Sequence, residues 1–183
     1  MKKLLVVVDM QNDFIDGALG TPEAQSIVQP VADFIREFDG DIFYTQDTHA
    51  ENYLETQEGK RLPVEHCIKD SVGWQLAPKV WEPIFKRQDR VFKKEMTLGF
   101  QKDSFGSRDL YAQLRSNATY FGDCEIHFVG VCTGICVISN AVLAKTALPE
   151  ARIVIHSDLC ACVSKESHWT AIEAMKLLQM EVV

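Results

Sequence analysis

The sequence lacks a long hydrophobic run, a cluster of basic residues and a Cys-x-x-Cys pair. Its uncharged apolar stretches, such as residues 4–8, are far shorter than the about 20 residues of a membrane-spanning helix. No signal peptide is predicted either, because Asp9 interrupts the first apolar run. The net charge is −7, without basic runs, which argues against nucleic acid or an anionic membrane as a partner.

Disulfide bonds are not expected. Six cysteines stand at positions 67, 124, 132, 136, 160 and 162 of a chain without a predicted secretory signal. We therefore expect reduced thiols and a cytoplasmic protein. Without a Cys-x-x-Cys pair, a thiol redox role is the weaker hypothesis, although Cys132 would lie near Cys136.

The chain is long enough to bury a full core and shows no internal boundary. It has 183 residues, of which 46% are hydrophobic, and no repeat, low-complexity segment or long linker. These properties predict a single domain over residues 1–183.

Apolar runs typical of buried strands alternate with segments of helical periodicity. The Val-rich run at residues 4–8 has the character of a strand in a parallel sheet. Thr21 and Pro22 supply an N-cap and a first-turn proline to a helix. By these patterns we expect strands at residues 4–8, 41–45, 90–94, 125–131, 152–156 and 181–183, and helices at 23–38, 75–80, 107–115, 135–147 and 166–178.

This alternation predicts an α/β fold, a three-layer α/β/α domain with a mostly parallel, Rossmann-like sheet of roughly six strands. In such sheets ligands bind beyond the carboxyl ends of the strands. Polar residues follow the predicted strands at those ends: Asp9, Asp47, Lys94, Cys136 and Asp158. We therefore expect these side chains to gather at one edge of the sheet. The long, irregular connection at residues 48–88 is also expected to be functional.

Cys136 lies where the fourth predicted strand gives way to a helix. Backbone N–H groups at a helix start lack partners, and the helix dipole there favours negative charge. A thiol in this place is expected to have a lowered pKa and to act as a nucleophile. The same N–H groups suit an oxyanion. The alternative is a small buried hydrophobic residue, which most free cysteines are.

Asp9 and Lys94 are the predicted partners of Cys136. A carboxyl group at the end of an apolar strand is partly desolvated, so its pKa should rise toward a value that suits proton transfer. Lys94 would stabilise the thiolate and orient the carboxylate. The alternatives are a turn-capping aspartate and a solvated lysine.

A second polar group combines Asp47 and His49 with the more distant His66. Two imidazoles and a carboxylate are ligands for Zn²⁺, Fe²⁺ or Mn²⁺ and leave positions for water or substrate. Cys67, beside His66, is an alternative ligand, and Glu55 is placed to assist through a water molecule. The sequence thus predicts a divalent metal site, with zinc as the favoured ion.

Four segments carry most of these residues: VDMQNDF at 8–14, TQDTH at 45–49, LPVEHC at 62–67 and GVCTGICV at 130–137. Together they resemble the isochorismatase-like cysteine hydrolases, which include nicotinamidase/pyrazinamidase, N-carbamoylsarcosine amidase and isochorismatase. The resemblance extends over nearly the whole chain and is strongest to the nicotinamidase/pyrazinamidase-like branch.

The resemblance implies a catalytic triad of Asp9, a lysine and Cys136. Some relatives have the lysine shortly before Phe-Gly-Ser, which here would select Lys102. We favour Lys94, because it ends a predicted strand and leaves the extra residues in a loop, where they cost little. The resemblance also implies a cis peptide before Cys132 and an oxyanion hole formed by the N–H groups of Cys132 and Cys136.

The resemblance further implies a metal held by Asp47, His49 and His66, a substrate pocket lined by Phe14, and a homo-oligomer. The implied activity is cysteine-dependent hydrolysis of a small amide, through a thioester and with release of ammonia. Two departures stand out: Gly134 replaces a usual aspartate, and residues 61–65 lack the tryptophan of many nicotinamidases. Alternatives are a carbamoyl or ureido substrate, or a non-catalytic protein that binds a small molecule or a metal.

Overall fold

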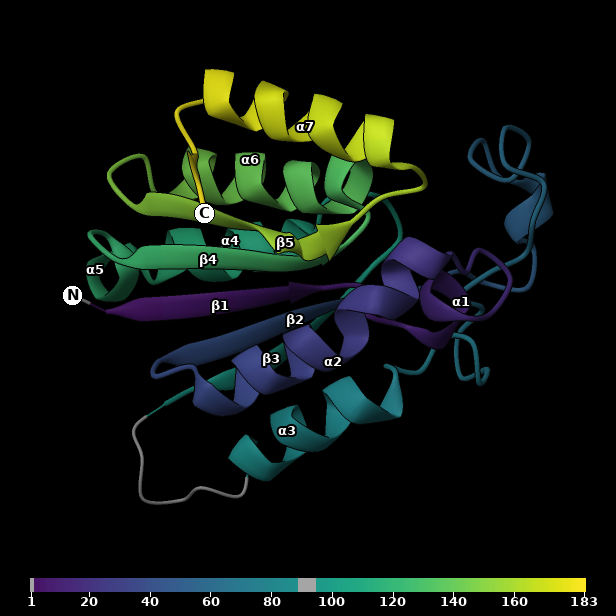
Figure 1. Cartoon of the computed structure of the whole chain (residues 1–183), viewed down its shortest axis with the longest axis horizontal. Helices are drawn as coiled ribbons and strands as arrows, with labels where there is room; N and C mark the ends of the chain where they lie inside the picture. The colour runs from purple at the N-terminus through teal and green to yellow at the C-terminus, as the bar shows by residue number, and fades with distance from the viewer. Residues whose placement is uncertain (1, 89–94) are drawn as a thin grey trace.

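The computed structural model describes residues 2–88 and 95–183, which contain a six-stranded sheet. Every pair of neighbouring strands is parallel, in the order β3-β2-β1-β4-β5-β6 (Figure 1). The strands are β1 (Lys3–Val8), β2 (Asp41–Asp47), β3 (Thr97–Lys102), β4 (Glu125–Val131), β5 (Arg152–Ala161) and β6 (Glu181–Val182). The helices are α1 (Asn12–Ile15), α2 (Pro22–Glu37), α3 (Pro78–Gln88), α4 (Arg108–Ser116), α5 (Ala118–Phe121), α6 (Ile138–Ala147) and α7 (Lys165–Leu177), with a 3₁₀ turn η1 (Tyr53–Glu55) and a π-helical turn η2 (Thr133–Val137).

The sheet separates two hydrophobic cores. In β1, Leu4 and Val6 belong to the core under α4, α6 and α7, whereas Leu5 and Val7 belong to the core under α2 and α3. Figure 1 shows these two helical layers on opposite faces of the sheet. The predicted three-layer α/β fold is therefore confirmed. No described helix has the length and apolar character needed to cross a membrane.

Several elements begin or end away from their predicted bounds. α2 matches closely, and Thr21 Oγ1 caps it by accepting from Ala24 N–H at 3.0 Å. β5 runs on to Ala161, past the predicted end at residue 156, and α3 starts at Pro78 rather than 75. The strand predicted at residues 90–94 lies outside the described residues. The third strand along the chain, β3, ends at Lys102.

The order of the strands reverses around β1, which pairs with β2 on one side and with β4 on the other. A topological switch of this kind opens a crevice at the carboxyl ends of the strands. Asp9 follows β1 and the η2 turn with Cys136 follows β4, so both flank this crevice.

Candidate active site

Asp9 is the first residue after β1 and has a left-handed φ of 47°. Thr45 of β2 holds its carboxyl group. The Thr45 hydroxyl donates to Asp9 Oδ1 at 2.6 Å and accepts from the Asp9 N–H at 3.2 Å. The Asp9 side chain is fully buried. Because burial disfavours the charged form, the pKa of Asp9 is raised, in the direction predicted from the sequence.

Lys102 ends β3 and lies at the centre of the polar cluster. Its Nζ is 2.7 Å from Asp9 Oδ2 and 3.6 Å from Cys136 Sγ. It also donates to Asp47 Oδ1 at 3.1 Å. Burial is the largest single effect and opposes the charged form of this lysine, but Asp9, Cys136 and Asp47 together outweigh it and raise the pKa of Lys102. The lysine therefore stays charged between two carboxylates and a thiol.

The structure brings Lys102, the other lysine that the resemblance offered, to Asp9 and Cys136. Lys94 lies outside the described residues. The preference for Lys94 depended on a strand ending there, whereas the strand that pairs with β2 ends at Lys102, opposite Asp47. The lysine of the cluster ends the third strand along the chain, but this strand ends eight residues later in the sequence than expected.

Cys136 sits in the η2 turn between β4 and α6. A cis peptide joins Val131 to Cys132, as the resemblance implied. The carbonyl of Cys132 accepts from Ile135 N–H at 3.0 Å and from Val137 N–H at 3.1 Å. Asn140 Nδ2 then donates to the carbonyl of Cys136 at 2.8 Å. These bonds hold the cysteine backbone on both sides.

The expected low pKa of Cys136 is wrong for this environment. The side chain is buried, and burial, followed by the nearby carboxylate of Asp9, raises the pKa of the thiol; Lys102 lowers it by less. The helix start favours the thiolate form of Cys136. Burial disfavours it more strongly, because a buried thiolate loses its hydration. The resting group is therefore a neutral thiol beside a carboxyl group that can take its proton.

Four side chains that can ligate a metal lie within 4.8 Å of one another: Asp47, His49, Glu58 and His66. Asp47 Oδ2 is 3.1 Å from His49 Nε2 and 3.6 Å from His66 Nε2, and Glu58 Oε1 is 4.0 Å from His49 Nε2. Three of these residues were predicted as ligands. Glu58 was not, whereas Glu55, which was expected to assist, is exposed and lies outside the cluster.

The chemistry of this cluster fits a divalent metal. Burial opposes ionisation of Asp47, but His49, His66 and Lys102 together outweigh it, so the pKa of Asp47 is lowered and the carboxylate is charged. Val64 O lies 2.8 Å from His66 Nδ1 and accepts its proton, so Nε2, which faces Asp47 Oδ2 at 3.6 Å, is the nitrogen that would ligate a metal. Cys67 is not part of the group; its backbone N–H donates to Asp13 Oδ2 at 2.7 Å.

Gln11 couples the metal cluster to the end of β1. This buried side chain donates through Nε2 to the Asp47 carbonyl at 2.8 Å and accepts through Oε1 from the Asp47 N–H at 2.7 Å. Gln11 and Thr45 were not predicted as site residues, although both lie in the segments at 8–14 and 45–49 that carry the family resemblance. Their place in these segments, beside predicted strand ends, is the signal that could have identified them.

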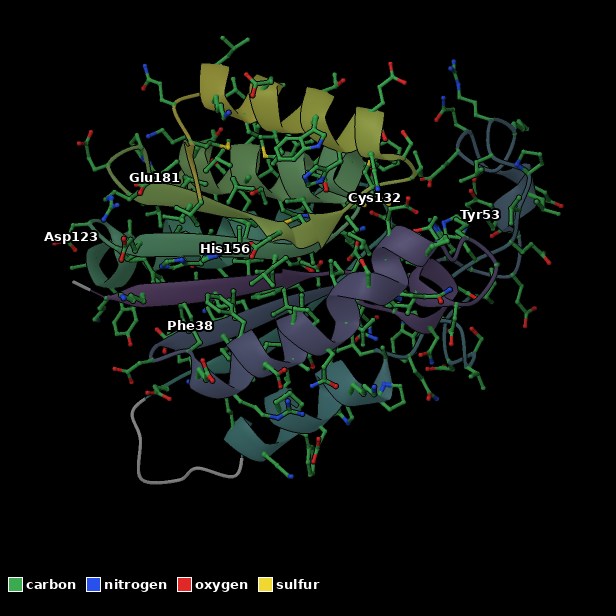
Figure 2. The ribbon with its side chains drawn as sticks, viewed as in Figure 1. Phe38, Tyr53, Asp123, Cys132, His156 and Glu181 are labelled. Atoms are coloured by element: carbon green, nitrogen blue, oxygen red, sulfur yellow. The ribbon has the colours of Figure 1, made fainter. Side chains whose placement is uncertain are left out.

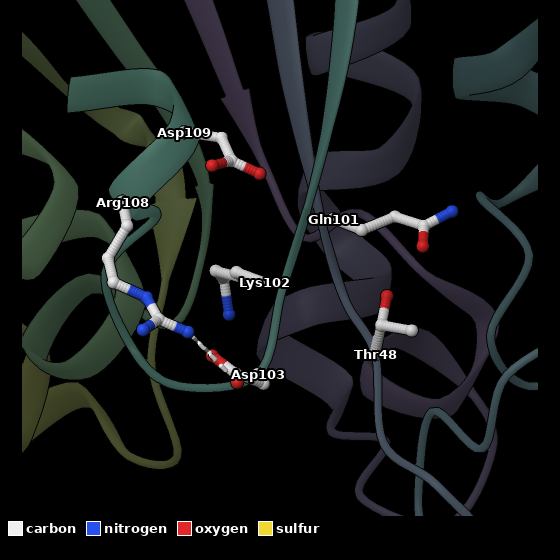
Figure 3. Close-up of a pocket in the computed structure, with 6 residues that line it drawn as sticks. All are labelled: Thr48, Gln101, Lys102, Asp103, Arg108 and Asp109. Atoms are coloured by element: carbon white, nitrogen blue, oxygen red, sulfur yellow. Dashed lines mark hydrogen bonds and ion pairs between the residues drawn. The ribbon is translucent and has the colours of Figure 1, made fainter. Parts of the chain in front are cut away.

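Phe14, the predicted pocket residue, stands against the metal cluster, with its ring centroid 5.5 Å from that of His66. A cavity of about 460 Å³ lies at the end of β3 and is lined by residues on both sides of this strand, among them Lys102, Thr48 and Arg108 (Figure 3). Arg108 forms an exposed ion pair with Asp103 there, at 3.1 Å. The lysine thus lies between the buried cluster and a solvent-filled hollow.

The parallel sheet, the switch point and the polar cluster beside it define an α/β protein of the doubly wound class with its site at the carboxyl edge. The model of the isochorismatase domain matches residues 3–183, and the chain belongs to that family, as predicted. An uncharacterized isochorismatase family protein PncA from Bacillus subtilis (strain 168) is 32% identical over 181 residues, which cover 94% of this chain and 93% of the relative.

Solved structures agree with this assignment. A pyrazinamidase/nicotinamidase from Streptococcus mutans UA159 superposes with a TM-score of 0.84 at 25% identity, covering 100% of both chains. A pyrazinamidase of Pyrococcus horikoshii in complex with zinc superposes with a TM-score of 0.76 at 26% identity, covering 100% of this chain and 99% of the other. The likeness therefore extends over the whole fold.

Proposed function

We propose that this protein hydrolyses a small amide with Cys136 as nucleophile, Asp9 as the base and Lys102 as the cation that joins them. One observation carries the proposal: Lys102 Nζ lies 2.7 Å from Asp9 Oδ2 and 3.6 Å from Cys136 Sγ, with all three side chains buried. Three residues from β1, β3 and the η2 turn converge there, and such a buried cation between an acid and a thiol suits nucleophilic catalysis.

The class of reaction is supported by the relatives. The chain is a hydrolase of amide C–N bonds, as expected from the family and from the pyrazinamidase/nicotinamidase neighbours. The cysteine mechanism, the thioester and the release of ammonia are our proposals from the geometry.

In the first step the Cys136 thiol gives its proton to Asp9 and its sulfur attacks the amide carbonyl. The raised pKa of Asp9 suits this transfer, since a weakly acidic carboxyl group holds the proton better than an exposed one. Lys102 offsets the charge that develops on sulfur. The N–H groups of Cys132 and Cys136 are proposed to receive the oxyanion.

In the second step Asp9 returns the proton to the leaving nitrogen, and ammonia departs. The acyl group then remains on Cys136 as a thioester. Water attacks the thioester, with Asp9 again taking a proton, and the acid product leaves. Thr45 supports this exchange: its hydroxyl donates to Oδ1 of Asp9, so Oδ2, on the side of Lys102, is the oxygen left to carry the proton.

Asp47, His49, Glu58 and His66 are proposed to hold a divalent metal, with zinc favoured by the donor set and by the zinc complex of the Pyrococcus pyrazinamidase. Such an ion, when bound, orients a substrate atom or a water molecule. Phe14, stacked at an angle on His66, is proposed to line the substrate side of this group. An aromatic amide such as nicotinamide or pyrazinamide is the substrate class we infer.

The test is ammonia release from a panel of nicotinamide, pyrazinamide, a carbamoyl amino acid and a ureido compound. We expect release from at least one amide by the wild type and none by Cys136→Ala. Cys124→Ala is a matched control, because this buried cysteine directly precedes β4, at the end of the strand opposite the candidate site. Release that persists in Cys136→Ala contradicts the proposal, as does equal loss in both variants.

A further inference from the structure

A second cysteine pair, Cys132 and Cys162, lies beside the candidate active site. β4 and β5 pair in parallel as far as Val131 and Ala161, and Cys132 and Cys162 are the residues that directly follow this pair. Neighbouring strands are about 4.8 Å apart, which is within the Cα separation of disulfide bonds. The two thiols are close enough for each to shift the pKa of the other.

Cys162 differs from the other cysteines in its electrostatic surroundings. The hydrogen bond from Cys132 is the largest influence, and the Ser167 hydroxyl and the N–H groups of Gly134 and Val163 add to it. Together they lower the pKa of Cys162 to about 5 against the effect of burial. The pKa is raised at each of the other five cysteines: Cys67, Cys124, Cys132, Cys136 and Cys160. A lowered pKa favours the thiolate, which is the reactive form of a cysteine, so Cys162 is the cysteine of this pair that we expect to react first.

Small molecules can reach this sulfur. Cys162 lines a cavity of about 190 Å³ together with Glu23, Lys165, His168 and Trp169. Figure 2 shows Cys132 at the end of the sheet, close under α7, where His168 Nδ1 also pairs with the Thr133 hydroxyl at 2.9 Å. The cavity therefore gives a small molecule access to Cys162.

We propose that Cys132 and Cys162 are a peroxide-sensitive pair that forms a reversible disulfide and thereby stops hydrolysis at Cys136. The link to hydrolysis rests on the proposed function; the disulfide does not. The Cys162 thiolate attacks one oxygen of a hydroperoxide, the O–O bond breaks, and hydroxide or the alkoxide leaves. The Cys132 thiol then attacks the sulfenic sulfur, loses its proton and displaces water. Two thiols become one disulfide, and hydrogen peroxide becomes two water molecules.

The disulfide stops hydrolysis by moving the turn that holds Cys136. Bond formation brings the two sulfur atoms to about 2 Å from one another. The Cys132 carbonyl anchors η2 through Ile135 and Val137, so a shift of Cys132 is passed to the nucleophile. The N–H of Cys132 is also a proposed oxyanion donor, and losing one such donor costs about 100-fold or more in turnover.

Peptide mapping tests the disulfide without reference to activity. The reduced full-length protein is treated with hydrogen peroxide, its free thiols are blocked and it is digested with trypsin. Cys132 then lies in peptide 116–145 and Cys162 in peptide 153–165. We expect these peptides to be cross-linked in the wild type and in Cys160→Ser, which is a matched control two residues away, but not in Cys162→Ser or in Cys132→Ser, because peptide 116–145 also contains Cys124 and Cys136. An absent cross-link, or one that persists in Cys162→Ser, overturns the proposal.

Ammonia release tests the consequence. We expect peroxide to lower wild-type turnover by about 100-fold or more and a dithiol to restore it. Cys162→Ser should show wild-type turnover before oxidation and keep it after the same exposure, whereas Cys160→Ser should behave as the wild type. Loss at equal rates in Cys162→Ser, or a cross-linked wild type with full turnover, overturns the switch. A wild type that hydrolyses no amide before oxidation refutes the proposed function instead, and the mapping still decides the disulfide.

Discussion

Replacing Lys102 by methionine removes one buried positive charge and keeps the side-chain length. Asp9 and Asp47 then lose the ammonium group that lies 2.7 and 3.1 Å from their oxygens. Breaking a buried ion pair by removing one partner costs about 3–5 kcal/mol, because the remaining charge is left without compensation. At about 2–4 °C per kcal/mol for a chain of this size, the melting temperature should fall by about 6–20 °C.

The same substitution should abolish most of the activity. Without the cation, the proton transfer from Cys136 to Asp9 leaves a buried thiolate with no opposite charge, so turnover should fall about 1,000-fold or more. Differential scanning calorimetry of the chelated protein measures the first effect, and ammonia release from the best amide of the panel measures the second.

Lys94→Met is the matched control, since it removes the same charge at the other lysine that the sequence offered. We expect Lys94→Met to retain wild-type turnover. A Lys102→Met protein that melts and turns over like the wild type would refute the assignment of Lys102. Loss of turnover confined to Lys94→Met would transfer the role to Lys94.

Three other perturbations test separate parts of the molecule. In a labelling experiment at pH 7, iodoacetamide should modify Cys162 before Cys136, because only the former has a lowered pKa; the reverse order contradicts the electrostatics described above. His49→Ala should lose the about one equivalent of zinc that the cluster is expected to hold, while Glu58→Gln should weaken zinc binding by about 10- to 100-fold, both measured by metal analysis after dialysis; zinc retained in His49→Ala argues against this ligand set. Burial lowers the pKa of His127 to about 4, whereas an unfolded histidine titrates near about 6.5, so the unfolded chain binds more protons between these values and stability is lost as pH falls through them; urea unfolding of His127→Phe should show a flatter pH dependence, and an unchanged slope would contradict this account.

The layers of the fold could be predicted from local patterns. Residues 4–8 form a run without polar residues, which is what a strand buried on both faces requires, and β1 contributes to both cores. Thr21 and Pro22 marked the start of α2 because capping depends on the few residues at a helix end. Both signals are contained in the segment that folds, so the sequence alone displays them.

The third strand could not be located this way. β3 contains Gly99, and glycine is depleted in strands, so local composition does not mark this segment as a strand. In the structure a Cβ at this position would collide with the Tyr44 ring of β2. A neighbour far away in the sequence therefore favours glycine here, and no local pattern reveals that contact.

The electrostatics of the candidate site escaped prediction for a similar reason. The lowered pKa expected for Cys136 came from its helix start alone, whereas burial and Asp9 act through tertiary packing and raise it. Glu58 lies in an irregular loop after η1, where no periodicity connects it with His49 or His66. Sequence motifs identified the residues at the strand ends. A metal ligand contributed by a loop, and the burial of each side chain, depend on the folded chain and could not be identified in this way.

Lys102 forms ion pairs with both Asp9 of the proposed catalytic group and Asp47 of the proposed metal cluster. Substitutions at different positions of the site therefore have unequal consequences. A substitution at His49 or His66 removes a ligand and leaves the ion pairs of Lys102 with Asp9 and Asp47 in place. A substitution at Lys102 breaks a pair on each side at once. In a lineage of diverging relatives, the ligand set can therefore erode one residue at a time, while the lysine stays until the whole cluster is abandoned.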